Sequence, residues 1–256
     1  MKKRTGLLFL TLLFCSDLAF ATCDAETVLM LHANGADTST TFTDSSVSAK
    51  TVTAVGNAQI DTAQSKFGGA SGLFDGTGDY LTAADSDDWN FGTGKFTIDM
   101  WIRVASAVTN GGLIGHSNTA APSGDLSDAF TFRTDTSTSL EFVLTTGGVN
   151  RIVQGGSHAV AAGTWFHVAL IRGWGGNADD WAITVNGSSI VTFTDADGFG
   201  NFTSTLRIGL DARGGAVFNG HIDELRVSKG IARWTVNFTP ETSEYCASAR
   251  RIISID

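Results

Sequence analysis

The sequence predicts an all-β protein whose strands form a sandwich or jelly roll. Short apolar segments follow one another along the chain, turns rich in Gly, Asn and Asp separate them, and no stretch of useful length has helical periodicity. Of the 26 acidic residues, 21 are Asp and 5 are Glu. Because Asp favours turns, this bias agrees with a loop-rich, helix-poor chain.

Individual strands can be assigned from their patterns. Phe96–Val104 alternates strictly, as does a strand with one face in a core, whereas Trp165–Arg172 is more uniformly apolar, like a central strand covered on both faces. Trp181–Val185 and Ser188–Phe193 flank an Asn-Gly pair that favours the type I′ turn of a hairpin. Further strands are expected at Thr27–His32, Tyr80–Ala83, Leu113–Ser117, Ala129–Arg133, Leu140–Thr145, Leu206–Leu210 and His221–Ser228.

Residues 1–21 have the features of a signal peptide. Three basic residues at 2–4 precede an apolar run at 7–14, and Ala19 and Ala21 supply the small residues of a cleavage site. A membrane anchor is one alternative, but the apolar run is too short to span a bilayer. We therefore expect cleavage after Ala21.

A lipoprotein site at Cys15 is a second alternative, against which the bulky Phe14 argues. Cleavage would leave residues 22–256 as one domain, because no linker divides them. No later segment has enough uninterrupted apolar residues to span a bilayer, so no membrane insertion is expected after cleavage. The expected location is secreted, extracellular or periplasmic.

The net charge excludes one class of partner, and the cysteines indicate an oxidising compartment. The net charge of −9 argues against a non-specific nucleic-acid binder, which needs a basic face to displace counterions from phosphates. After cleavage two cysteines remain, Cys23 and Cys246, near opposite ends of the chain. In an oxidising compartment such a pair predicts a disulfide, with two free thiols on frayed ends as the alternative.

Six segments of the sequence, taken together, resemble a known family. They are Phe67–Leu81, Phe96–Ile102, Trp165–Leu170, Thr184–Gly187, Leu206–Gly209 and Phe218–Val227. In this order they resemble the concanavalin A-like lectin/glucanase superfamily, in its laminin G-like branch, over about Thr27 to Trp234. The resemblance implies a jelly roll of two antiparallel sheets whose terminal strands lie side by side. The superfamily includes sugar-binding modules, adhesion domains and some glycosidases, so the fold alone does not decide the function.

The acids argue against an enzyme. Glucanases of this superfamily carry Glu-x-Asp-x-(x)-Glu on one strand, and no such motif occurs here. Glycosidases need two carboxylates across the scissile bond, whereas strand alternation predicts that Asp223 and Glu224 point to opposite faces. Serine-hydrolase and P-loop motifs and paired His or Cys spacings are also missing. We expect a protein without catalytic residues.

The glycine-rich segment Gly173–Asp180 is the predicted sugar-binding loop. Trp174 offers an aromatic platform for a sugar ring, and Asn177, Asp179 and Asp180 offer groups that bond its hydroxyls. The alternative is a hairpin loop whose Trp174 folds back on the edge of the sandwich.

Asp75 and Asp223 are the predicted ligands of a structural calcium ion. Asp75 lies in a Gly-rich turn with flexible carbonyls, and alternation predicts Asp223 on the same face as Leu225 and Val227, where a lone acid is costly. The first interpretation of Asp223 itself is a structural acid that accepts hydrogen bonds from backbone N–H groups or an arginine, and calcium binding is the alternative to it. Alternation also predicts an ion pair between Glu224 and Arg226.

These observations predict a secreted, non-catalytic carbohydrate-binding or adhesion module whose partner is a glycan or a surface protein. The alternative is a structural or protein-interaction domain of a surface or virion-like assembly. A glycoside hydrolase that lacks the usual acid motif is the third reading.

Overall fold

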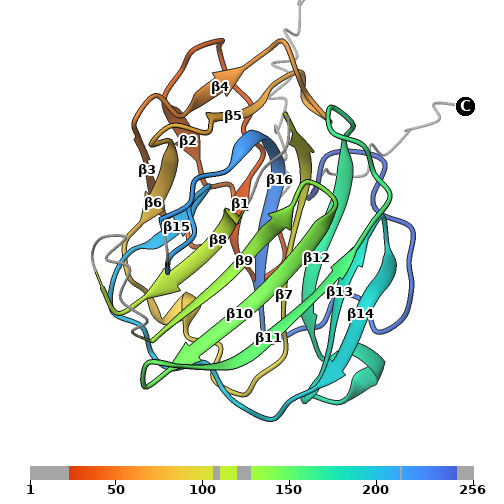
Figure 1. The fold of residues 1–256 in the computed structure, drawn as a ribbon. Helices are drawn as coiled ribbons and strands as arrows, with labels where there is room; N and C mark the ends of the chain where they lie inside the picture. The colour runs from red at the N-terminus through yellow and green to blue at the C-terminus, as the bar shows by residue number, and fades with distance from the viewer. Residues whose placement is uncertain (1–22, 106–109, 120–127, 214, 247–256) are drawn as a thin grey trace, which may run out of the picture.

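The computed structural model describes residues 23–105, 110–119, 128–213 and 215–246. The predicted signal peptide lies outside these residues. The chain forms two sheets that face each other (Figure 1), and every strand pair is antiparallel. The predicted all-β sandwich is therefore confirmed. Apart from strands, the described part of the chain contains two short 3₁₀ turns, η1 (Asp87–Trp89) and η2 (Trp174–Gly176).

The two sheets, here called A and B, have eight strands each. In sheet A, β1 lies beside β16 and the other strands follow in order. Sheet A consists of β14 (Ser188–Thr194), β13 (Asp180–Val185), β12 (Phe166–Arg172), β7 (Phe96–Val104), β16 (Asn219–Lys229), β5 (Ser71–Asp75), β4 (Gln59–Asp61) and β1 (Thr27–Leu31). Sheet B consists of β11 (Val149–Ser157), β10 (Ser139–Thr146), β9 (Ala129–Thr136), β8 (Gly111–Ser117), β15 (Leu206–Ile208), β6 (Tyr80–Ala83), β3 (Thr51–Val55) and β2 (Thr41–Thr43).

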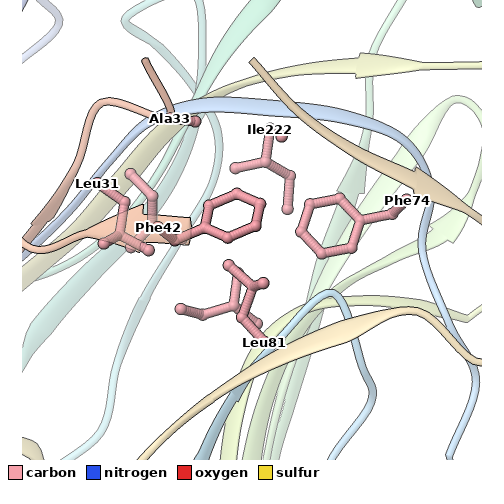
Figure 2. A pocket seen from close by; sticks show the side chains of 9 residues that line it. Leu31, Ala33, Phe42, Phe74, Leu81 and Ile222 are labelled. Atoms are coloured by element: carbon pink, nitrogen blue, oxygen red, sulfur yellow. The ribbon is translucent and has the colours of Figure 1, made fainter. Parts of the chain in front are cut away.

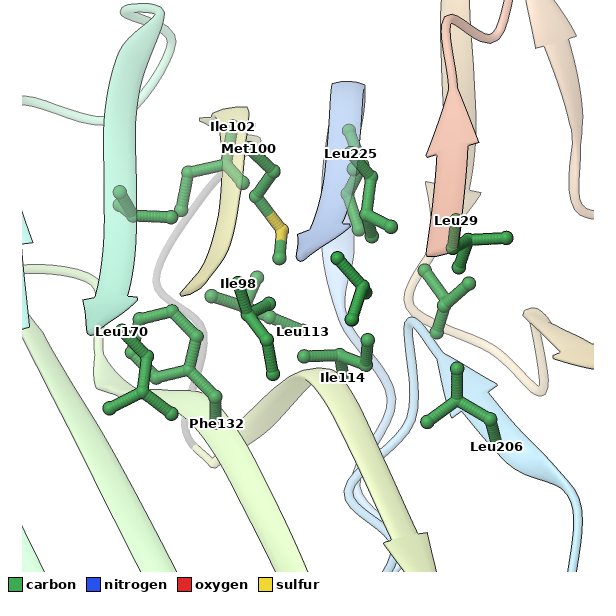
Figure 3. Packing of buried hydrophobic residues seen from close by; sticks show 14 of the residues in the cluster. Leu29, Ile98, Met100, Ile102, Leu113, Ile114, Phe132, Leu170, Leu206 and Leu225 are labelled. Atoms are coloured by element: carbon green, nitrogen blue, oxygen red, sulfur yellow. The ribbon is translucent and has the colours of Figure 1, made fainter. Parts of the chain in front are cut away.

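The core lies between the sheets. In Figure 3, Ile98 and Met100 of β7 and Leu170 of β12 lie close to Leu113 and Phe132 of sheet B, and all five are fully buried. Burying one such side chain stabilises the fold by roughly 1.5–3 kcal/mol, so the inner faces hold the sheets together.

Five strands are not predicted by the sequence patterns. β2, β3, β4 and β5 have three to five residues each and lie in a stretch rich in Thr, Ser, Gly and Asp, where no apolar pattern stands out. β11 is longer, but it is an edge strand whose side chains are mostly exposed, so it lacks an apolar face that a pattern could reveal.

A bulge in β16 corrects the predicted faces of this strand. The pairing with β7 shifts between Asp223 and Arg226, and Glu224 takes a left-handed φ of 51°. The extra residue restarts the alternation, so Leu225 joins the core while Asp223 stays opposite Trp101 on the outer face of sheet A. Alternation predicted that Asp223 and Leu225 share a face of the sheet, and this prediction is wrong.

The ends of the described chain meet on the outer face of sheet A. Thr27 of β1 pairs with Ser228 of β16, as expected for terminal strands that lie side by side. A disulfide joins Cys23 and Cys246, whose Cα atoms are 4.9 Å apart. The predicted bond is present, and a disulfide is typical of proteins outside the cytoplasm. The described residues include no helix that is both long and apolar enough to cross a membrane.

The hairpin between β13 and β14 has the predicted turn, because Asn186 and Gly187 take φ values of 48° and 79°.

A Cβ at Gly187 would overlap the carbonyl oxygen of Phe238. We expect Gly187→Ala to lower the free energy of unfolding by about 2–4 kcal/mol, measured from urea midpoints, because the clash adds to the cost of the left-handed backbone. Gly147→Ala is the matched control, because Gly147 has φ 61° and open space around it, so this change costs about 1 kcal/mol from the backbone alone. Equal losses in the two variants would contradict the steric role of Gly187.

Candidate functional site

The glycine-rich loop after β12 borders a hollow at one side of sheet A. The hollow has a volume of about 260 Å³ and an open mouth. Trp174 is half-buried there, so part of its indole lies against the protein and part is available to a ligand. The lining residues are Trp174, Gly175, Asp180, Trp181, Thr192, Phe193 and Thr194.

Asp180 is the charged group of this hollow, and its carboxylate is held in place by two neighbours. The Asn177 amide donates to Oδ2 at 2.9 Å, and the Thr194 hydroxyl donates to Oδ1 at 2.8 Å. These hydrogen bonds, that of Asn177 first, lower the pKa of Asp180 below its ordinary value. Asp180 is therefore an ionised acceptor at neutral pH, oriented beside Trp174.

Asp179 faces a different neighbour. Its carboxylate pairs with the buried guanidinium of Arg172 at 3.4 Å, and it does not line the hollow. Arg172 also donates to the carbonyl oxygens of Ala178 at 2.8 Å and Asp197 at 3.0 Å. The structure thus brings three of the four predicted sugar-binding residues together and separates Asp179 from them. Arg172, which sequence reasoning treated as a strand end, positions the loop.

Two other cavities are less suited to a sugar. A hollow of about 460 Å³ lies over β9, β10 and β11, but none of its lining residues is aromatic. There Glu141 is engaged by Arg133 at 2.6 Å, and Arg133 also pairs with Asp211. Inside the sandwich, Figure 2 shows Leu31, Phe42 and other apolar side chains around a cavity of about 10 Å³. This apolar space is too small for a ligand.

Asp75 and Asp223 do not meet. Asp75 pairs with Asn219 across β5 and β16, and Asp223 lies four positions farther along β16, about 13 Å away at the usual rise of a strand. Two ligands of one calcium ion lie within about 5 Å of each other. The predicted calcium site that uses both residues is therefore not formed.

Each of these two acids has local hydrogen bonds instead. Asp75 accepts from the Thr77 backbone N–H at 2.7 Å and from the Asn57 amide at 3.0 Å. Oδ2 of Asp223 accepts from the backbone N–H groups of Lys66 and Phe67, at 2.8 and 3.1 Å. Asp223 is fully buried, and this burial raises its pKa to about 7. Its Oδ1 has no hydrogen-bond partner among the described residues.

A cluster that the sequence patterns missed lies beside Asp223. His32, Glu224 and Glu244 each place one donor atom within 4.8 Å of the others, an arrangement that can hold a metal ion. His32 directly follows β1, Glu224 occupies the bulge of β16, and Glu244 lies two residues before Cys246. Their separation in the sequence gives no spacing motif, so only the fold reveals the cluster.

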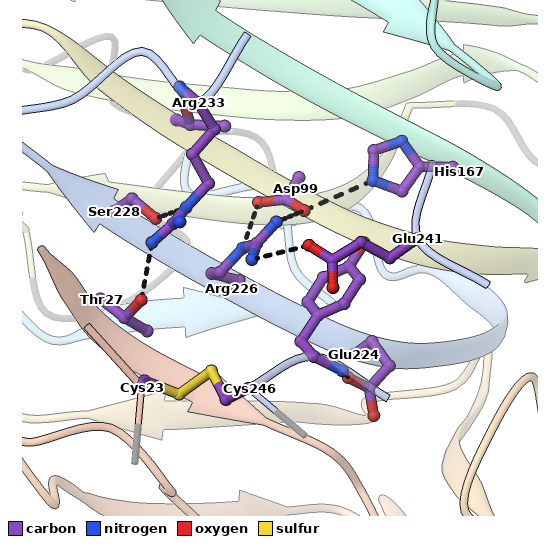
Figure 4. A network of polar contacts seen from close by, with 12 residues as sticks. Cys23, Thr27, Asp99, His167, Glu224, Arg226, Ser228, Arg233, Glu241 and Cys246 are labelled. Carbon is purple, nitrogen blue, oxygen red and sulfur yellow. Dashed lines mark hydrogen bonds and ion pairs between the residues drawn. A yellow bond between two sulfur atoms is a disulfide. The ribbon is translucent and has the colours of Figure 1, made fainter. Parts of the chain in front are cut away.

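A buried ion network occupies the same face of sheet A (Figure 4). Arg226 pairs with Asp99 through Nη2 at 2.9 Å and Nε at 3.0 Å, and also with Glu241 at 3.3 Å. His167 contacts the same Asp99 carboxylate at 3.4 Å. The predicted pair of Glu224 with Arg226 is therefore wrong, because the bulge turns Arg226 toward Asp99.

Comparisons with known proteins agree with this architecture. A family model described as the concanavalin A-like lectin/glucanases superfamily matches residues 75–232. No curated protein matches the sequence. Among solved structures, domain 4 of a GH43 extracellular arabinanase from Geobacillus stearothermophilus, in complex with arabinotriose, has a TM-score of 0.57 and 15% identity. This match covers 81% of the present chain and 94% of that domain.

Two toxin binding domains are also similar. The botulinum neurotoxin serotype G binding domain has a TM-score of 0.58 and 13% identity, with coverage of 80% of this chain and 48% of that one. The binding domain of Paraclostridial Mosquitocidal Protein 1 has a TM-score of 0.56 and 14% identity, with coverage of 80% and 49%. The chain thus spans about half the length of these two domains. At such low identity the likeness shows a shared fold.

Proposed function

The chain belongs to the concanavalin A-like lectin/glucanases superfamily, and from this premise we propose that it is a secreted, non-catalytic module that binds carbohydrate. The site is the hollow beside Trp174. The observation that carries the proposal is that the half-buried Trp174 and the ionised Asp180 line one open hollow.

The chemistry of the hollow suits a sugar. The indole of Trp174 offers an apolar face to the C–H groups of a sugar ring, while Asp180 and the hydroxyls of Thr192 and Thr194 reach its hydroxyls. Its volume of about 260 Å³ lies just below the roughly 300–1,000 Å³ of sites for drug-sized ligands, so a small saccharide suits it. The lining contains Asp180 and no cationic residue, so neutral sugars fit better than acidic ones.

The absence of catalytic chemistry from the proposal rests on how the acids are used. The hollow is lined by one carboxylate, whereas glycoside hydrolysis needs two across the scissile bond. Glu141 is engaged by Arg133, and Glu224 is buried against His32. The arabinanase domain in complex with arabinotriose supports the proposal as an example of a sugar-bound domain with this fold.

A glycan array followed by calorimetry tests the proposal. We expect hits among neutral glycans, and we expect Trp174→Ala to weaken their binding at least tenfold, about 1.4 kcal/mol. Asp180→Asn should also weaken binding, because it removes the charged acceptor. Asp179→Asn is the matched control and should bind as the wild type does, because Asp179 faces Arg172.

The array also separates the remaining readings. Binding that survives in both Trp174→Ala and Asp180→Asn would place the sugar elsewhere. A folded protein that binds no glycan would refute the proposal and favour the structural or protein-interaction reading. Sugar release from any oligosaccharide would refute its non-catalytic part.

A further inference from the structure

The cluster of His32, Glu224 and Glu244 combines an imidazole with two carboxylates. The closest pair is His32 Nδ1 and Glu224 Oε1, at 2.8 Å. Two ligands of a tetrahedral zinc-type ion lie about 3.3 Å apart, so an ion fits between these atoms after a small shift of the side chains. The Asn34 amide donates to Glu244 Oε1 at 2.6 Å and so orients the third group.

The backbone approaches this cluster unusually closely. Gly68 has a φ of 61°, and a Cβ there would overlap Glu244 Oε1 and Asn34 Oδ1. Glu224 has a left-handed φ of 51° although it is not glycine, a conformation that costs roughly 1–2 kcal/mol. Such strain persists where the surrounding structure requires it, and here it places the Glu224 carboxylate beside His32.

Two consecutive acids are buried at the cluster. Glu224 and Asp223 are consecutive and both have 0% exposure, and Asp223 Oδ1 has no partner among the described residues. In the described part of the chain, the one ion pair that either acid forms is that of Glu224 with His32, whose imidazole is charged only when it is protonated. Arg226 is engaged by other carboxylates, as described above. A buried carboxylate is stabilised by hydrogen bonds or by a cation, and Glu224 accepts one hydrogen bond from the Tyr245 backbone N–H at 2.6 Å. A divalent ion between Glu224 and His32 would add positive charge directly at this carboxylate.

We propose that His32, Glu224 and Glu244 bind one divalent cation of the zinc class, which fastens the C-terminal segment to β1 and β16. Three protein ligands with one nitrogen donor suit zinc, with water in the fourth position. Calcium is disfavoured, because it requires six to eight oxygen ligands. The inference does not depend on the proposed sugar site.

The ligand set predicts what the ion does. Glu244 lies two residues before Cys246, so the metal and the disulfide would hold the same short segment. Because the unfolded chain cannot bring three distant ligands together, binding stabilises the native state by mass action.

Tag-free protein stripped with chelator provides the test. We expect one Zn²⁺ per chain by calorimetry and an increase of several degrees in Tm, and no such increase with Ca²⁺. Co²⁺ should give the visible absorption of a four-coordinate site. Glu244→Gln, which removes a half-buried ligand, and His32→Gln should each weaken Zn²⁺ binding at least tenfold.

Two controls match these variants chemically. Glu26→Gln changes an exposed acid, and His158→Gln removes a half-buried imidazole outside the cluster. Both should bind Zn²⁺ as the wild type does. Circular dichroism checks that each variant is folded. Three results would overturn the proposal. The first is a wild type that does not bind Zn²⁺, and the second is wild-type Zn²⁺ affinity in Glu244→Gln and His32→Gln. The third is an increase in Tm with Ca²⁺ as large as that with Zn²⁺.

Discussion

Replacement of both Cys23 and Cys246 by serine is expected to lower Tm by roughly 10–20 °C. The bond joins residues 223 positions apart, and chain-entropy models give a loop of this length about 5 kcal/mol. For a domain of this size, each kcal/mol corresponds to roughly 2–4 °C. The loss also acts locally, because the segment before Cys246 places the buried Tyr245 and the half-buried Glu244 over sheet A.

Differential scanning calorimetry with and without a reductant measures this effect. Reduction of the wild type should reproduce the loss, while the same reductant should leave the double serine variant unchanged. A serine variant whose Tm equals that of the oxidised wild type would show that packing of the C-terminal segment, rather than the covalent bond, holds the ends together.

Regular strands were the most predictable part of this molecule. The bounds of β7, Phe96–Val104, and of β6, Tyr80–Ala83, agree with the prediction, because residues that enter the core alternate along each strand with residues that do not. The second face of β7 is also buried, where Trp101 packs in a cluster with Tyr245. The side-by-side terminal strands followed from the family resemblance. β11 escaped prediction because an exposed edge strand has no buried face to generate a pattern.

The positions of the candidate site residues depend on a bulge and on tertiary contacts, which the alternating pattern of a strand sequence does not reveal. One extra residue at Glu224 reverses the faces of the strand after it, which made the predicted pairing with Arg226 wrong. Asp75 and Asp223 both carry the carboxylate that calcium binding needs, but the fold does not bring them close together. The loop between β12 and β13 was predictable from its glycine-rich composition, whereas the contact of Asp179 with Arg172 depends on tertiary structure; the sugar-binding role of Trp174 stays a proposal.

Asp99→Asn is expected to lower the free energy of unfolding by roughly 3–5 kcal/mol at neutral pH. Asp99 is fully buried, and its two oxygens bind Nε and Nη2 of Arg226. The substitution leaves the guanidinium of Arg226 in a buried site with Glu241 as its remaining acid partner, and an uncompensated buried charge is costly. Urea unfolding at pH 7 measures the loss.

The same pair predicts a pH dependence. Burial alone would raise the pKa of Asp99, but the charge of Arg226 and the hydrogen bonds from His167 and Arg226 outweigh burial and hold the pKa at about 2. The ordinary value is 3.8, so the ionised form is favoured in the folded state. Its contribution, about 2 kcal/mol from the shift, is present above pH 3.8 and is lost as the pH falls through about 2.

Acid unfolding of matched variants isolates this contribution. Between about pH 4 and pH 2, the wild type should lose about 2 kcal/mol more stability than Asp99→Asn, which has no carboxylate to protonate at this position. Asp87→Asn is the control, because Asp87 is exposed, and it should change stability at pH 7 by less than about 0.5 kcal/mol and follow the wild-type acid curve. Parallel acid curves for the wild type and Asp99→Asn would assign the acid sensitivity to other carboxylates and would leave the Asp99–Arg226 pair with a packing role alone.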